Sequence, residues 1–210
     1  MDGSTARLAV NPARWHESYF SYDDLLWRDL ALFMVMFRLR NEQGLLVHGA
    51  SSVLDGSGVL CVGPSGAGKT TIATLLRCGG PAEVLSDEHP IVRRFFRAEP
   101  ESSGGEFRVY GSPWPSCGGY VSAESAPLKR IYFLEHGPEN ALVSVGRKEA
   151  VARLLQVATL PWDCADLFDP CLETVESLLA TVPAAVLSFK PDEEVVEVIR
   201  QDLASERVII

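Results

Sequence analysis

The chain has 210 residues, of which 47% are hydrophobic and 22% are charged. This composition is ordinary for a globular protein and excludes wholesale disorder. The net charge is −9, from 19 Lys and Arg against 28 Asp and Glu, which argues against a nucleic-acid partner. No apolar run approaches the ~18 residues of a membrane span, and the N-terminal residues lack a secretion-signal pattern. We therefore expect a cytoplasmic protein that does not bind membranes.

Five cysteines are spread along the chain, and none forms a C-x-x-C pair. An odd count without that spacing gives no support to a zinc site or to a disulfide framework. We expect reduced thiols that pack as small apolar groups.

A helix is predicted at Tyr22–Arg40, where Asp23 and Asp24 suit the positive end of the helix dipole and Ser21 can cap it. Its Leu30–Phe37 stretch is apolar on all sides. Such a helix is usually buried on more than one side, in a core or at an interface.

The next segment reads as a β-hairpin, with a strand at Leu45–Leu54, a turn at Asp55–Gly58 and a second strand at Gly58–Val62. The rest of the chain mixes helical and strand periodicities. We predict helices at Lys69–Arg77, Arg147–Ala158, Asp169–Thr181 and Asp192–Leu203, and strands at Glu83–Leu85, Ile91–Phe96, Phe107–Tyr110, Leu128–Leu134 and Ala184–Phe189.

A complete phosphate-binding motif of the form G-x-x-x-x-G-K-[ST] lies between an apolar strand and a helix. Its loop amides can point at phosphate oxygens, its lysine can reach the β- and γ-phosphates, and its threonine hydroxyl can bind Mg²⁺. We therefore predict ATP and Mg²⁺ as cofactors. The nucleotide-binding residues are Gly63, Pro64, Ser65, Gly66, Ala67, Gly68, Lys69, Thr70 and Thr71.

An acidic pair, Asp87 and Glu88, ends the next predicted strand. In P-loop ATPases such an aspartate holds Mg²⁺ and the glutamate polarises water, whereas in a kinase an aspartate accepts the proton of the acceptor hydroxyl. Upstream, His48 lies on the strand that the hairpin brings toward the loop. A single histidine on an apolar strand is more often a hydrogen-bonded core residue, so these residues leave the alternatives open.

Three segments together resemble the catalytic domain of the HPr kinase/phosphorylase family. They are His48-Gly49-Ala50-Ser51, the block DGSGVLCVGPSGAGKTT, and Leu85-Ser86-Asp87-Glu88. The family has a His-Gly/Ala strand, a short turn, a P-loop and a paired-acid motif one helix later, and its fold is distantly similar to ATP-dependent phosphoenolpyruvate carboxykinase. The family signature around Glu-x-Arg-Gly is replaced here by the sequence that begins at Tyr110. The chain therefore looks more like the short HPr kinase-like proteins, some of which phosphorylate serine on a precursor peptide or free serine.

The resemblance implies roles for three residues. Asp87 stands where the family has its general base toward a serine hydroxyl, Glu88 where it has a second aspartate, and His48 where its active-site histidine lies. It also implies that Thr70 and Asp87 hold Mg²⁺, and that the acceptor is a serine-containing peptide or protein or a small hydroxyl compound. Because the resembled family forms hexamers, a homo-oligomer is a further expectation.

We predict a single α/β domain over residues 1–210, with a central mixed sheet, a P-loop and flanking helices, similar to the HPr kinase C-terminal domain. Residues 1–44 form a helical lead-in, 45–135 the nucleotide-binding core, and 136–210 an α/β C-terminal part. No linker in the sequence is long or flexible enough to mark a domain boundary.

Several further features have two interpretations each. The Gly111–Gly119 segment is rich in Gly and Pro and must be a loop, in which Trp114 either contacts substrate under a lid or packs on its own protein.

Positive side chains near the acidic motif and on a later strand either offset phosphate charge or are solvated and ion-paired, the second being favoured. These are Arg93, Arg94, Lys129 and Arg130. The other histidines, His16, His89 and His136, are interpreted as structural.

The sequence thus predicts a kinase that transfers the γ-phosphate of ATP to a hydroxyl, with serine as the leading acceptor. The alternative is a P-loop ATPase or nucleotide-dependent regulator that needs no hydroxyl acceptor. A carboxykinase-like enzyme is a weaker reading, because it would need more cationic groups and a second metal site.

Overall fold

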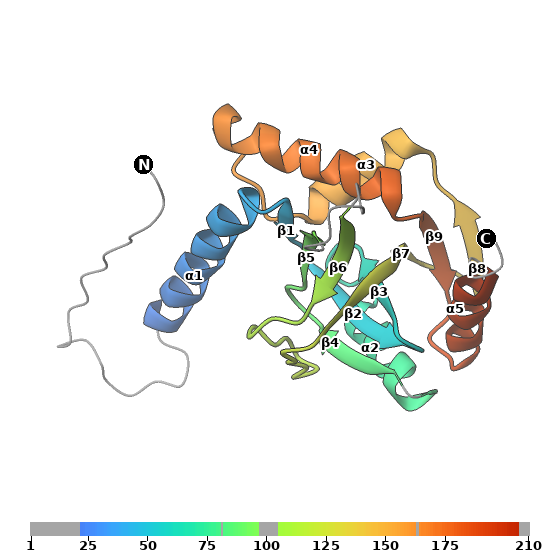
Figure 1. Cartoon of the computed structure of the whole chain (residues 1–210). Helices are drawn as coiled ribbons and strands as arrows, with labels where there is room; N and C mark the ends of the chain where they lie inside the picture. Colours follow the sequence, from blue (N-terminus) through green and yellow to red (C-terminus); the bar gives the residue numbers. More distant parts are fainter. Residues whose placement is uncertain (1–21, 81, 97–104, 163, 206–210) are drawn as a thin grey trace.

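Runs of short strands separated by helices assemble into a layered α/β fold (Figure 1). The computed structural model describes the chain except residues 1–21, 81, 97–104, 163 and 206–210, and the side chains of 22–29. The elements are α1 (Tyr22–Arg40), β1 (Gly44–Leu46), β2 (Gly49–Leu54), β3 (Ser57–Val62), α2 (Lys69–Cys78), β4 (Glu83–Ser86), β5 (Ile91–Phe95), β6 (Glu106–Tyr110), β7 (Ser125–His136), β8 (Ala141–Ser144), α3 (Arg147–Val157), α4 (Ala165–Thr181), β9 (Ala184–Phe189) and α5 (Glu194–Ser205).

A mixed sheet of nine strands in the described part of the chain has the order β1-β5-β6-β7-β3-β2-β4, and β9 and β8 branch from β7. The long strand β7 makes the branch possible. Its first residues, Ser125–Pro127, pair antiparallel with β6, whereas Ile131–His136 pair in parallel with β9. Its other edge pairs in parallel with β3. The predicted α/β class, with a central mixed sheet and flanking helices, is confirmed.

Helices cover both faces of the sheet, because successive side chains of a strand point to opposite faces. On β3, Leu60 and Val62 belong to a core that includes α3 and α4, whereas Val59 and Cys61 belong to a core that includes α2 and α5. All four of these side chains are fully or almost fully buried. The strand that leads into the phosphate loop is therefore fixed between two apolar layers.

The predicted strand at Leu45–Leu54 is wrong as a single element, because the chain changes partners at Val47 and His48. β1 pairs with β5, whereas β2 pairs with β3 and β4. Between them, the Val47 N–H donates to the carbonyl of Pro90 (3.1 Å) and the His48 N–H to that of Val157 (2.7 Å). These long-range bonds interrupt the strand and turn His48 out of the ladder.

The predicted hairpin is confirmed, and its turn is shorter than the expected Asp55–Gly58. Leu54 pairs with Ser57, and the two residues between them, Asp55 and Gly56, have φ of 51° and 77°. Positive φ at both central positions is the type I′ geometry, whose twist matches that of the flanking strands.

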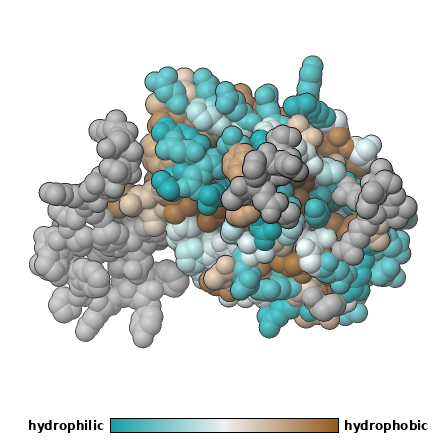
Figure 2. Space-filling model, viewed as in Figure 1, coloured by the Kyte–Doolittle hydropathy of each residue, from teal (hydrophilic) through white to brown (hydrophobic). Residues whose placement is uncertain are grey.

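Helix α1 has the predicted bounds. Within this chain it packs mainly on β1 and also contacts α4, and its opposite face is solvent-exposed. Burial in a core on more than one side is therefore not found among the described residues, and burial of the exposed face at an interface stays a prediction. Figure 2 shows apolar (brown) surface on the side of the molecule where α1 lies. The buried side chains are Leu32, Met36 and Leu39, and the exposed ones are Phe33, Met34 and Phe37. The proposed cap, Ser21, lies outside the described residues.

The other predicted elements are present with shifted ends, and the sequence missed only β8 among the described strands. None of the helices in the described part of the chain has the length and hydropathy of a transmembrane segment.

Candidate active site

The phosphate loop leaves β3 and enters α2, whose first residue is Lys69. Gly66 and Gly68 have φ of 81° and 93°, in the left-handed region that favours glycine. The Ala67 N–H donates to the carbonyl of Pro64 (3.1 Å), which closes the loop. Pro64, Ser65 and Gly66 are exposed at its tip, and Thr70 and Thr71 form the first turn of the helix. The loop fits phosphate, since its tip is open and the positive end of α2 points at it.

Lys69 folds back into this loop. Its Nζ donates to the carbonyls of Gly63 (3.0 Å) and Pro64 (2.9 Å), and the residue is 7% exposed. Burial lowers the pKa of the Lys69 ammonium, and the nearby Glu88 carboxylate opposes that shift. The ammonium therefore lies at the start of the loop, against the carbonyls of Gly63 and Pro64.

His136, interpreted from sequence as structural, lies against the loop. Its Nε2 is 2.8 Å from the Gly66 carbonyl, to which it donates because a carbonyl only accepts. Its ring stacks on Phe189 at 5.9 Å between centroids. Phe189 in turn fills the space beside Gly68, where an added Cβ would lie 2.5 Å from the ring. The last residues of β7 and β9, His136 and Phe189, thus pack against the phosphate loop. No spacing in the sequence indicates this contact.

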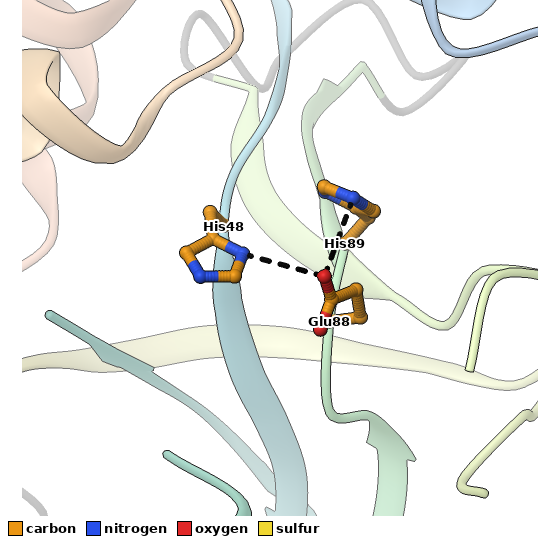
Figure 3. Close-up of side chains that lie close together, drawn as sticks. All are labelled: His48, Glu88 and His89. Carbon is orange, nitrogen blue, oxygen red and sulfur yellow. Dashed lines mark ion pairs between the residues drawn. The ribbon is translucent and has the colours of Figure 1, made fainter. Parts of the chain in front are cut away.

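The side chains of His48, Glu88 and His89 form a cluster (Figure 3), and the charge of Lys69 is close enough to act on two of them. The Glu88 Oε1 is 3.8 Å from the Nδ1 of His48 and 3.8 Å from the Nε2 of His89. Burial and the positive charge of Lys69 lower the pKa of His48, and Glu88 opposes this shift. The structure therefore brings together two predicted site residues, His48 and Glu88, with Lys69, and adds His89, which the sequence analysis set aside.

Asp87 points elsewhere, into the Gly111–Gly119 loop. It is 1% exposed, and its two carboxylate oxygens accept the backbone N–H groups of Ser116 (3.1 Å) and Gly118 (2.9 Å). An added Cβ at Gly118 would collide with the carboxylate, so this close approach needs glycine. The loop is therefore anchored on the acid that the sequence analysis assigns as the base.

Further contacts hold the loop over the acidic motif. The hydroxyls of Ser86 and Ser112 are 3.3 Å apart, and Trp114 presents its ring to His89 at 6.5 Å between centroids. Trp114 is also packed against the small core formed by α1 and β1. Its packing on its own protein is confirmed, and its role in a lid stays a prediction.

The four positive side chains near the acidic motif and on β7 have other partners or are exposed. Arg93 pairs with Glu42 (3.0 Å), Arg94 donates to Ser177 (3.2 Å), and Arg130 forms a two-bond contact with Asp202 on α5. Lys129 is exposed. The favoured interpretation of ion-paired or solvated side chains is confirmed.

A cavity of about 260 Å³ opens beside the start of the phosphate loop. Its walls are largely apolar, with two polar side chains on α3, and it is lined by Val62, Gly63, Pro64, Phe133, Leu134, Arg153, Gln156 and Val157. Arg153 is paired with Glu135 and Glu149. Because Gly63 and Pro64 also hold the Lys69 ammonium, the cavity adjoins the γ-phosphate end of the loop.

Comparison with known proteins identifies the family. The family model described as SynChlorMet cassette protein ScmC matches residues 23–176, and the chain belongs to this family. A search of the curated proteins found no match. Among solved structures, the Hpr(Ser) kinase/phosphatase from Coxiella burnetii matches with 11% identity and a TM-score of 0.40, over 78% of this chain and 90% of that chain.

Proposed function

We propose that this member of the ScmC family is an ATP- and Mg²⁺-dependent kinase that transfers the γ-phosphate to a hydroxyl group. The leading acceptor is a serine of a peptide or protein, or a small hydroxyl compound. One observation carries the proposal: a complete phosphate loop whose buried lysine adjoins both an acidic motif and a cavity of acceptor size.

Each part of the site has a role in this proposal. The loop amides and Lys69 bind the phosphates, and Thr70 contributes its hydroxyl to Mg²⁺. Bound ATP supplies the phosphoryl group, and little covalent chemistry is asked of the protein. Positioning and electrostatic stabilisation supply most of the rate.

The cavity beside Gly63 and Pro64 is the proposed acceptor subsite. Its volume of about 260 Å³ suits a single residue or a small molecule rather than a folded surface. Its walls are mostly apolar, and Gln156 and Arg153 offer polar contacts to an acceptor. An acceptor carboxylate would compete with Glu135 and Glu149 for Arg153.

Asp87 keeps the proposed role of general base, with a condition attached. A carboxylate offers about four acceptor positions, so the two backbone bonds to Ser116 and Gly118 do not exhaust it. Because Asp87 is 1% exposed, the Gly111–Gly119 loop must move before an acceptor hydroxyl reaches it. The predicted lid thus becomes part of the proposal.

The test is ATP turnover with Mg²⁺ in water alone, with free serine, and with a pool of serine-containing peptides. We expect ADP and a phosphorylated product only with an acceptor. Asp87→Asn should keep nucleotide binding and lose transfer, and Lys69→Ala should lose both. Exposed residues provide matched controls, Asp166→Asn on α4 and Lys148→Ala on α3.

Equal ADP formation in water alone would contradict the kinase and favour the alternative, an ATPase or nucleotide-dependent regulator. In that case Asp87 would serve Mg²⁺ and Glu88 would polarise water. Retained transfer in Asp87→Asn would move the base elsewhere. Full nucleotide affinity in Lys69→Ala would contradict the assignment of the loop.

A further inference from the structure

Three nitrogen and oxygen donors converge beside the phosphate loop (Figure 3). They are the Nδ1 of His48, the Nε2 of His89 and a carboxylate oxygen of Glu88, and all lie within 4.8 Å of one another. No other group of three His, Cys, Asp or Glu side chains meets this spacing among the residues that the structure describes.

The backbone fixes both segments that carry these donors. The His48 N–H donates to the Val157 carbonyl (2.7 Å), and the next residue, Gly49, donates its N–H to the carbonyl of Glu88 (3.0 Å). The bond from Gly49 to Glu88 therefore joins the segment that carries His48 directly to the segment that carries Glu88 and His89. Trp114 lies at the edge of the His89 ring. Little rearrangement is needed to hold the three donors in one place.

The spacing is close to that of a metal site. Two donors that are each about 2.1 Å from a tetrahedral ion lie about 3.4 Å apart. The Glu88 oxygen lies 3.8 Å from each of the two nitrogens, and the three donors lie within 4.8 Å of one another. To reach the spacing of a metal site, the pairs with Glu88 must close by about 0.4 Å and the two nitrogens by at most about 1.4 Å. The side chains of His48, Glu88 and His89 are 35%, 20% and 11% exposed, which leaves a path for an ion and for a water or substrate ligand.

The donor types select the class of ion. Imidazole nitrogen suits Zn²⁺, Co²⁺ and similar transition cations, whereas Mg²⁺ prefers an all-oxygen environment with several waters. Two imidazoles and one carboxylate leave at least one coordination position open, as in catalytic rather than structural sites. This donor set differs from the Thr70 and Asp87 set predicted for Mg²⁺.

We propose that His48, Glu88 and His89 form a binding site for one transition-metal dication, with an open coordination position. The site needs no nucleotide and is separate from the Mg²⁺ that accompanies ATP. In the kinase proposed above, its open position would take an oxygen of the acceptor or of the γ-phosphate. The site itself does not depend on that function.

Co²⁺ is the probe, because its visible absorption reports the geometry and donors of its site. The metal-free full chain, without an affinity tag that contains histidine, is titrated with Co²⁺ in the absence of nucleotide. We expect one Co²⁺ per chain with the spectrum of a four- or five-coordinate nitrogen and oxygen site, displaced by Zn²⁺. His89→Ala and His48→Ala should weaken binding at least about tenfold, and the exposed control Asp166→Asn should leave it unchanged.

Three results would overturn the proposal. They are equal Co²⁺ affinity in wild type and His89→Ala, displacement of Co²⁺ by moderate Mg²⁺, and a spectrum with thiolate-to-metal charge transfer. His89→Gln, with a circular dichroism spectrum like that of wild type, guards against loss of binding through misfolding. Nucleotide binding is measured separately with Mg²⁺ and should survive His89→Ala, so a failure of the metal site is distinguishable from a failure of the proposed kinase.

Discussion

Gly68→Ala tests whether the phosphate loop is strained and supported as the structure indicates. Gly68 precedes the loop lysine, has φ of 93°, and leaves no room for a side chain beside Phe189. A residue with a Cβ in the left-handed region costs about 1–2 kcal/mol. The added Cβ would lie 2.5 Å from the Cζ of Phe189, which is 1% exposed and cannot swing into solvent. Such overpacking costs about 1–3 kcal/mol more.

We therefore expect Gly68→Ala to lower the free energy of unfolding by about 2–5 kcal/mol. Gly66→Ala is the matched control. Gly66 has a similar φ of 81°, but a Cβ there meets nothing within 4 Å. Only the backbone cost of about 1–2 kcal/mol remains for this variant. The difference between the two variants isolates the contact with Phe189.

Urea unfolding followed by circular dichroism measures both variants, and binding of a fluorescent ATP analogue shows whether the loop still holds phosphate. Gly68→Ala should be the less stable variant and should bind the analogue more weakly than wild type. Equal unfolding free energies for Gly68→Ala and Gly66→Ala would contradict the predicted clash with Phe189, because that contact would then cost nothing.

Three further predictions concern other parts of the chain. Asp202→Ala removes the carboxylate that accepts two bonds from the partly buried Arg130, so it should lower the unfolding free energy by about 3–5 kcal/mol. Urea titrations measure the loss, and a loss below about 1 kcal/mol would contradict the prediction. Asp87→Ala removes the anchor of the Gly111–Gly119 loop, so it should speed alkylation of the exposed Cys117 several-fold. Peptide mass mapping measures the rate, and an unchanged rate would show that other contacts hold the loop. Burial raises the pKa of the Cys61 thiol to about 12. This thiol should therefore resist alkylation at pH 8 in the native protein and react in urea. Rapid alkylation of Cys61 in the native protein would disprove its burial.

Local signals in the sequence were sufficient for much of the fold. The type I′ turn at Asp55 and Gly56, the phosphate loop and the bounds of α1 all depend on residues that are neighbours along the chain. The break at His48 was missed although Gly49 directly follows it, because the run Leu45–Leu54 reads as one strand. It arises from hydrogen bonds to Pro90 and Val157, residues far away in sequence.

The short strand β8 (Ala141–Ser144) was missed for a related reason. It is mostly exposed and lies at the edge of the sheet, so it has little apolar alternation to mark it. Its extended form depends on pairing with β9. The apolar stretch of α1 likewise did not tell which of its sides is covered within this chain, since composition does not show how many neighbours a helix has.

The phosphate-loop motif is predictable from one short segment, because the glycine positions, Lys69 and Thr70 are fixed by the geometry of one turn between a strand and a helix. The surroundings of this segment depend on the assembled fold. Bonds between distant segments join His48 to Glu88 and His89, and Asp87 turns toward the amides of Ser116 and Gly118. These contacts are not predictable from residue types, because backbone amides, carbonyls and cavities have no residue type that marks them and acquire partners only when the sheet is assembled.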